Sequence, residues 1–319
     1  MEMQQFIEKL LAAAKEQGID PAEAYVNAGT NFSADVMQGS IDTYSVSDKL
    51  GLGLRGIYQG KMGYASTQAF DDEAIQQLIE GVKEGASLRE DEDVEEIYAG
   101  DASYPTVNSW SDALEQVSAT EKLDACLNIE KAAVSSQPTV TRCSGTRLST
   151  ISRETRICNS YGLNLHHRCN LYLTYTDAIA QEGDSTATAV AFQSGRDFSE
   201  VDPQALGAKA AREAAEALHG SPVPAGSYRI ILRWDAMQAL LETFCGIFSA
   251  ENAQQGMSLL KGREGEAIAA PCVTLMDDPL LPGGFSSYPF DDEGVPGREK
   301  LVIREGVLQT LLHNRRTAS

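Results

Sequence analysis

Long apolar runs are absent from this sequence, and basic residues are scarce. No stretch approaches the ~20 consecutive apolar residues that a membrane-spanning helix needs, and Glu2, Glu8 and Lys9 interrupt the basic-then-apolar layout of a signal peptide. The chain has 26 Lys and Arg against 46 Asp and Glu, a net charge of −20 at pH 7. Such a surface repels nucleic-acid phosphates and anionic lipid head groups. We therefore expect a cytoplasmic protein that binds neither nucleic acid nor membranes directly.

Paired cysteines are also missing. The six cysteines form no CxxC or CxxxC motif, and a chain of 319 residues can bury a core without covalent cross-links. We expect reduced, mostly buried thiols rather than disulfides. Cys169 lies two residues from His167, and Cys245 opens a glycine-containing helical segment, so each is a candidate nucleophile. Burial in the core is the better interpretation of both residues.

Histidine, the usual zinc ligand, occurs only four times. His166 and His167 are adjacent, so in a strand they point to opposite faces. His219 stands at the end of a predicted helix, where a cation meets the helix dipole favourably, and His313 is alone. The acidic run Glu90–Glu96 is typical of a solvated surface rather than of a metal site. The sequence predicts no metal site and no catalytic residue in this chain.

The residues that are present predict an α+β fold of mostly antiparallel sheets with flanking helices. The length favours two domains, and the stiff segment Ser221–Gly226 places their boundary between 1–220 and 221–319. Alternating apolar residues predict a strand meander over 22–66, with a hairpin at Gln59–Lys61, and further antiparallel strands over 140–198. Gly51-x-Gly53-x-x-Gly56 matches a dinucleotide-binding fingerprint only formally, because it falls in this hairpin.

Helices are predicted where apolar residues recur at helical spacing between capping signals. The first of these segments begins near Phe6 and ends at Gly18. The others cover residues 71–85, 120–134, 202–218 and 236–248. In the second domain, strands are expected at Tyr228–Leu232, Val273–Met276 and Leu301–Leu312.

Several short motifs, in this order, resemble those of the TldD/PmbA family, named for modulators of DNA gyrase and microcin maturation, and in particular its PmbA (TldE) branch. Each motif alone is common, but their order and spacing together are specific. They are Gly51–Arg55, Gly63–Ser66, Asn159–Gly162, Pro224–Gly226, Phe248–Asn252, Asp277–Pro279 and Asp291–Gly297.

The resemblance implies a cytosolic protease assembly. Its TldD-type subunit carries zinc on an HExxxH helix together with a later cysteine, its TldE/PmbA-type subunit completes a chamber, and unfolded or leader-type peptides are cleaved inside. The corresponding helix of this chain falls on about Leu241–Ser249 and contains no histidine. The resemblance therefore implies a non-catalytic subunit without a cofactor of its own, with zinc held by a TldD-type partner.

Substrate contacts are expected just after this helix. Ser249, Glu251 and Asn252 are the candidates for binding an extended peptide, although capping of the next helix explains them as well. The run Asp291–Glu293 is interpreted as organising a turn. The alternative function is a stand-alone peptide-binding or regulatory protein without proteolytic activity, for example a homodimer.

The end of the sequence differs from the family pattern. Family members continue beyond Ser319, so the resemblance implies a C-terminal domain that is cut short. Strands that would pair with Leu301–Leu312 are then missing, and an open edge is expected there.

Overall fold

The computed structural model describes residues 2–90 and 96–318, which form two compact units. The larger unit comprises Met1–Gly100 and Val107–Pro222, and the smaller comprises Asp101–Thr106 and Val223–Ser319. Both contain antiparallel sheets and helices, so the predicted α+β class is confirmed. Most of the acidic run Glu90–Glu96 lies outside the described residues. None of the described helices is long and apolar enough to cross a membrane.

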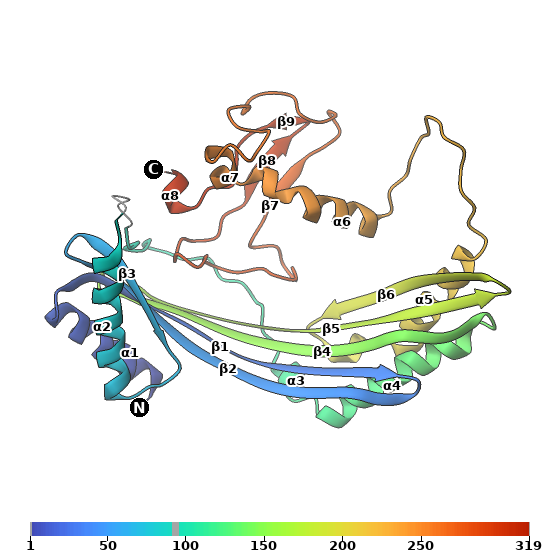
Figure 1. Ribbon diagram of the computed structural model, residues 1–319, viewed down its shortest axis with the longest axis horizontal. Coiled ribbons are helices and arrows are strands. Elements are labelled where there is room, and N and C mark those ends of the chain that lie inside the picture. Colours follow the sequence, from blue (N-terminus) through green and yellow to red (C-terminus); the bar gives the residue numbers. More distant parts are fainter. Residues whose placement is uncertain (1, 91–95, 319) are drawn as a thin grey trace. The chain divides into compact units, whose positions relative to one another are not determined.

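A six-stranded antiparallel sheet forms the larger unit, with the strand order β3-β2-β1-β4-β5-β6 (Figure 1). The predicted meander and the predicted second set of strands are thus one sheet, joined where β1 pairs with β4. The strands are β1 (Ile19–Met37), β2 (Ser40–Tyr58), β3 (Lys61–Thr67), β4 (Val140–Asn159), β5 (Asn164–Glu182) and β6 (Ser185–Gly195).

Helices cover one face of this sheet at both ends of its strands (Figure 1). Alternate residues of a strand share a face, and on β1 Ala24 and Val26 pack under α1 and α2, and Phe32 and Ala34 under α4. The helices of this unit are α1 (Met3–Glu16), α2 (Asp72–Leu88), α3 (Asp112–Glu115), α4 (Ala119–Ser136) and α5 (Pro203–Ala217), with a 3₁₀ turn at Phe198–Glu200.

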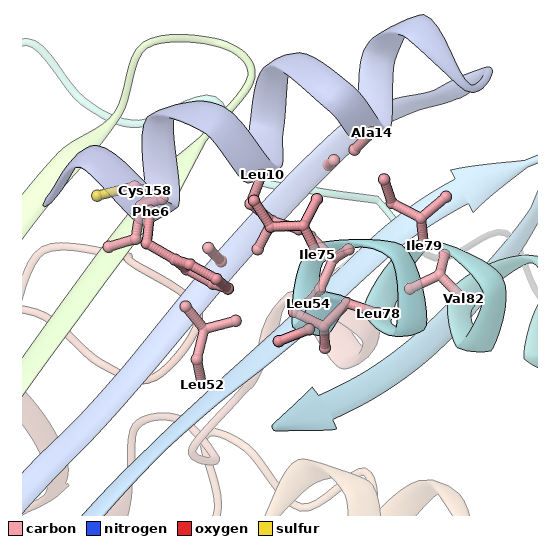
Figure 2. Packing of buried hydrophobic residues seen from close by; sticks show 14 of the residues in the cluster. Phe6, Leu10, Ala14, Leu52, Leu54, Ile75, Leu78, Ile79, Val82 and Cys158 are labelled. Atoms are coloured by element: carbon pink, nitrogen blue, oxygen red, sulfur yellow. The ribbon is translucent and has the colours of Figure 1, made fainter. Parts of the chain in front are cut away.

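Figure 2 shows the core under α1 and α2. Phe6 and Leu10 of α1, Leu78 and Val82 of α2 and Leu54 of β2 belong to one cluster of buried side chains. The helices form here because their apolar residues recur at three- and four-residue intervals, which places them on one face. Truncating such a buried side chain to alanine costs about 2–5 kcal/mol, so this cluster anchors one end of the sheet.

Side chains cap the beginnings of two helices of this unit. Ser118 and Glu121 form a capping box at the start of α4: the Ser118 hydroxyl accepts from the Glu121 amide at 3.2 Å, and the Glu121 carboxylate accepts from the Ser118 amide at 2.9 Å. Asp202 caps α5, whose first residue is Pro203. These bonds satisfy backbone groups that a helix end otherwise leaves unpaired.

The smaller unit contains a three-stranded sheet, β7 (Leu275–Asp277), β8 (Lys300–Arg304) and β9 (Val307–Leu308). The helices of this unit are α6 (Trp234–Phe244), the 3₁₀ helix η2 (Cys245–Phe248), α7 (Ala250–Gln254) and α8 (Arg315–Ala318). Its core consists of Phe248, Ala250, Ala253, Leu260, Val302, Ile303, Leu308 and Leu311.

Two predictions for this unit were wrong. Tyr228–Leu232 is not a strand, and the Ile231 side chain is 92% exposed. An alternating apolar run becomes a strand only where an edge supplies hydrogen bonds and an apolar cover, and no described strand pairs with this segment. The helix predicted over 236–248 ends at Phe244, and the chain continues as the more tightly wound 3₁₀ helix η2.

Candidate functional site

The helix α6 and the 3₁₀ helix η2 lie where the family resemblance predicts the counterpart of the zinc helix. No residue of α6 is buried, and Trp234 at its start is 65% exposed. Met237, Leu240 and Leu241 are exposed as well, so the helix offers apolar side chains to solvent. Large exposed apolar patches mark sites of interaction with other molecules.

Ser249 joins η2 to the short helix α7. Its hydroxyl accepts from the Asn252 amide at 3.3 Å, which caps α7. On either side of Ser249 the backbone pairs with Leu312: the Ala250 amide donates to the Leu312 carbonyl at 2.9 Å, and the Leu312 amide donates to the Phe248 carbonyl at 2.7 Å. Ser249 therefore caps α7, the role that the sequence offered as the alternative to peptide binding.

Asn252 and Glu251 connect α7 to its surroundings. The Asn252 side-chain amide donates to the Gly246 carbonyl at 2.8 Å and so fixes the η2 turn. The Glu251 carboxylate pairs with Arg316 at 3.3 Å and accepts from Asn314 at 3.4 Å. The structure thus brings the three candidates together on the first turn of α7, half-buried and bonded to the protein. Peptide binding by them remains a prediction.

Asp291 organises a turn, as predicted. Its carboxylate accepts from the amides of Glu293 and Val295, both at 2.9 Å. Burial raises the pKa of Asp291, although these two amide bonds oppose the shift. The Glu293 carboxylate in turn accepts from the Arg315 amide at 3.1 Å. These acids therefore hold loops and the start of α8 in place.

The adjacent His166 and His167 lie on β5, and His313 belongs to the smaller unit. His166 Nε2 lies 3.1 Å from the Glu154 carboxylate, whereas His167 follows it on β5 and points to the opposite face, as predicted. His313 Nδ1 lies 2.9 Å from the Thr317 carbonyl oxygen. Within residues 2–90 and 96–318, no group of three or more His, Cys, Asp or Glu side chains is arranged to hold a metal ion.

The cysteines are all free thiols in the described structure, and Cys126, Cys143 and Cys158 are buried as expected. Cys169 is half-buried, and burial raises its pKa, which disfavours the nucleophilic thiolate. The expectation of a buried Cys245 was wrong. This residue is exposed because it follows α6, which has no packed face.

A cavity of about 230 Å³ on the helix-covered face of the larger unit was missed by the sequence reasoning. It contains the buried Lys122 of α4. The signal was available: Lys122 precedes Cys126 by four residues and Ile129 by seven, so it falls on the buried face of the helix. The cavity is lined by Thr30, Phe32, Val46, Leu114, Glu115, Ala119, Lys122, Thr150 and Ser152.

A second, more open cavity of about 560 Å³ lies beside the glycines of the hairpin. Gly51 and Gly53 line it with Tyr25 and Asn27 of the neighbouring strand. A side chain at Gly51 would meet no atom within 4 Å, so this glycine leaves open space, whereas a side chain at Gly56 would collide with Ile19 at 2.3 Å. The glycines of one motif therefore have two roles, an open surface and tight packing.

Family models match most of the chain. They are described as the PmbA/TldA metallopeptidase domain 1 at residues 22–86, the central domain at 112–218 and the C-terminal domain at 225–319. The chain belongs to the PmbA/TldA metallopeptidase family. The resemblance drawn from the short motifs is thereby confirmed, although the models do not distinguish the catalytic branch from the PmbA (TldE) branch.

Curated relatives in this family are named metalloproteases. One from Methanocaldococcus jannaschii is 25% identical over 98% of this chain and 69% of its own length. Metalloprotease PmbA of Escherichia coli O157:H7 is 23% identical over 93% of this chain and 66% of its own length.

Solved structures have the same fold. A protein of Thermotoga maritima described as a modulator of a DNA gyrase has a TM-score of 0.92 and 28% identity, and the match covers 99% of this chain and 72% of that one. TldE from Thermococcus kodakarensis has a TM-score of 0.86 at 22% identity, over 98% of this chain and 71% of that one.

Proposed function

We propose that this chain is a PmbA/TldE-type, non-catalytic subunit of a cytosolic TldD/TldE-like zinc metalloprotease that processes unfolded or leader-type peptides. One observation carries the proposal. The segment from α6 through η2, which corresponds to the zinc helix of the catalytic branch, contains no histidine. Family membership supplies the context of peptide hydrolysis.

The chemistry of zinc explains why this difference matters. An HExxxH helix supplies two imidazoles that bind zinc and a carboxylate that activates water. This segment carries the apolar Phe244, Ile247 and Phe248 instead, and Phe248 belongs to the core of the smaller unit. A single thiol at Cys245 does not replace a pair of imidazoles. We therefore place the zinc and the hydrolysis on a TldD-type partner.

The exposed apolar side chains of the smaller unit support an assembled state. Ile231 and Trp234 are largely exposed, and Phe244 and Leu240 extend the same apolar character along α6. Aromatic residues in such patches contribute strongly to protein interfaces. In the proposed assembly this surface meets the TldD-type subunit, and the larger unit contributes surface that holds the peptide.

Reconstitution tests the proposal. The full chain is purified alone and together with the HExxxH-containing protein of the same genome, and zinc content and peptide cleavage are measured. We expect zinc in the partner only and cleavage by the mixture only. Replacing the glutamate of the partner's HExxxH motif with glutamine should abolish all cleavage. Stoichiometric zinc with turnover by this chain alone would contradict the proposal.

The same experiment addresses the alternative of a stand-alone binding protein. A peptide-binding homodimer without proteolytic activity would bind peptides but would not co-purify with a TldD-type protein. The absence of any HExxxH-containing relative from the genome would favour that alternative.

A further inference from the structure

The cavity at Lys122 contains a buried positive charge. The Lys122 residue is 8% exposed, and its ammonium donates to the Thr150 hydroxyl at 2.9 Å and lies 4.9 Å from the centre of the Phe32 ring. No ion pair with a carboxylate involves Lys122 in the described part of the chain. Burying an ammonium group destabilises the folded protein unless the group is paired with an anion.

Two features of the surroundings have opposite effects on the binding of an anion in this cavity. Ala119, at the first residue of α4, lines the cavity, and the amino end of an 18-residue helix carries a partial positive charge. Glu115 also lines it: its carboxylate accepts from the side-chain amide of Asn170 at 2.7 Å but keeps its negative charge, which offsets part of the charge of Lys122. Burial lowers the pKa of Lys122, and the charge of Glu115 opposes that shift.

The walls of the cavity are suited to a small apolar group. Phe32, Val46 and Leu114 line one part of it, next to the hydroxyl groups of Thr150 and Ser152. Its volume of about 230 Å³ is below the ~300–1,000 Å³ typical of pockets for drug-sized ligands. The cavity is therefore sized for one residue of a larger ligand.

An unpaired strand edge lies beside the cavity. The pairing of β2 with β3 begins at Leu52, so no described strand pairs with the outer edge of β2 over residues 40–51. Val46, from the middle of this edge, lines the cavity and is 54% exposed. An extended peptide can add to a free edge through backbone hydrogen bonds, which tolerate many side-chain sequences.

We propose that this cavity binds the C-terminal residue of an extended peptide. The Lys122 ammonium pairs with the terminal carboxylate, the apolar walls receive the last side chain, and the preceding backbone pairs with the β2 edge. The inference rests on the proposed function only in taking the ligand to be a peptide. Binding is measured on this chain without a partner subunit, so failure of the site and failure of the protease assembly give different results.

Three fluorescein-labelled apolar peptides that differ only at the last residue test the site by fluorescence anisotropy at neutral pH. One ends in leucine with a free carboxylate, one in leucine amide, and one in glutamate amide. We expect the free acid to bind roughly tenfold more tightly than the leucine amide, the effect of one charge-assisted hydrogen bond. The glutamate amide should bind like the leucine amide. Equal affinities for acid and amide would overturn the proposal, and tight binding of the glutamate amide would overturn its assignment to the peptide terminus.

Variants connect the effect to the cavity. Lys122→Met should remove the preference for the free acid, whereas Lys131→Met, an exposed lysine on the same helix, should retain it. A folded Lys122→Met protein that still prefers the acid would refute the proposal. If Lys122→Met does not fold, Val46→Glu at the exposed edge serves instead, and should weaken binding of the acid about threefold more than that of the amide. An unchanged ratio in that variant would equally refute it.

Discussion

At the scale of single residues, buried polar side chains hold the larger unit in place. The Glu130 carboxylate, on the buried face of α4, accepts from the amides of Gln38 and Gly39 at 2.9 and 2.6 Å. Those two amides belong to the turn between β1 and β2, where Gly39 has a positive φ of 76°. One side chain therefore connects a helix to a hairpin turn about ninety positions away in sequence.

Glu130→Gln should destabilise the protein, because a carboxamide leaves one of these amides with a poorer acceptor or none. We expect a loss of about 1–3 kcal/mol in the free energy of unfolding, measured by urea denaturation. Asp124→Asn, an exposed acid on the same helix, is the matched control and should change the free energy little. Equal stability of the two variants would show that the turn does not depend on Glu130.

Asp35 should make stability depend on pH. Its hydrogen bonds to Arg147, at 2.6 and 3.0 Å, hold the pKa of the Asp35 carboxyl below its ordinary value of 3.8. A carboxyl whose pKa is lower in the folded state stabilises above its unfolded pKa, and this contribution is lost as the pH falls through the folded pKa. The pair is partly exposed, so solvent screening keeps its contribution small.

The corresponding experiment compares wild type with Asp35→Asn across acidic pH. At neutral pH the wild type should be the more stable protein in urea, and the difference should shrink as the pH falls below 3.8. A difference in the free energy of unfolding that does not change with pH would mean that the charge of Asp35 plays no part.

At the scale of elements, local signals predicted most of the larger unit. The helices α1, α2, α4 and α5 and the β2–β3 hairpin lie where apolar spacing, caps and turn residues placed them, because those determinants lie within a few residues of each element. The pairing of β1 with β4 was not predictable. It joins Glu23 to Asn159, and no short-range pattern specifies such a contact.

The candidate site was predictable only in part. Ser249, Glu251 and Asn252 do share one turn of α7, which their spacing implies. Lys122 was missed because a lysine on a helix is normally exposed, and only the neighbouring buried positions reveal its face. The strand at Tyr228–Leu232 failed for the opposite reason: its residues favour a strand, but pairing requires a partner elsewhere in the chain.

The contact between α4 and α5 depends on Gly207. A Cβ at this position would lie 2.5 Å from the Ile129 carbonyl oxygen and 2.6 Å from the Ala133 amide, so a backbone must move. Gly207→Ala should therefore destabilise by about 1–3 kcal/mol, more than the helix-propensity gain of about 1 kcal/mol. Gly85→Ala in α2 is the control, because its Cβ would make only ordinary contacts of 3.5 Å or more. Thermal unfolding of both variants tests this, and a stabilised Gly207→Ala would contradict it.

At the scale of the whole molecule, the smaller unit exposes apolar surface that the proposed assembly covers. Replacing both Trp234 and Phe244 by serine should reduce co-purification with a TldD-type partner by about tenfold or more, the usual effect of losing an aromatic interface residue. No residue of α6 is buried, so folding should not change. The control is Gln238→Ala on the same helix. Retention of partner binding by the double variant would place the interface elsewhere.

The pairing of β1 with β4 also decides how the chain can be divided. The family models separate residues 22–86 from 112–218, yet β1 lies in the first of these and β4 in the second, and both are interior strands of one sheet. Either segment produced by itself would expose an interior strand as a new edge of the sheet. Such an edge pairs readily with other chains and favours aggregation. The two sequence modules are therefore one folding unit, which can be completed only after β4 has emerged from the ribosome.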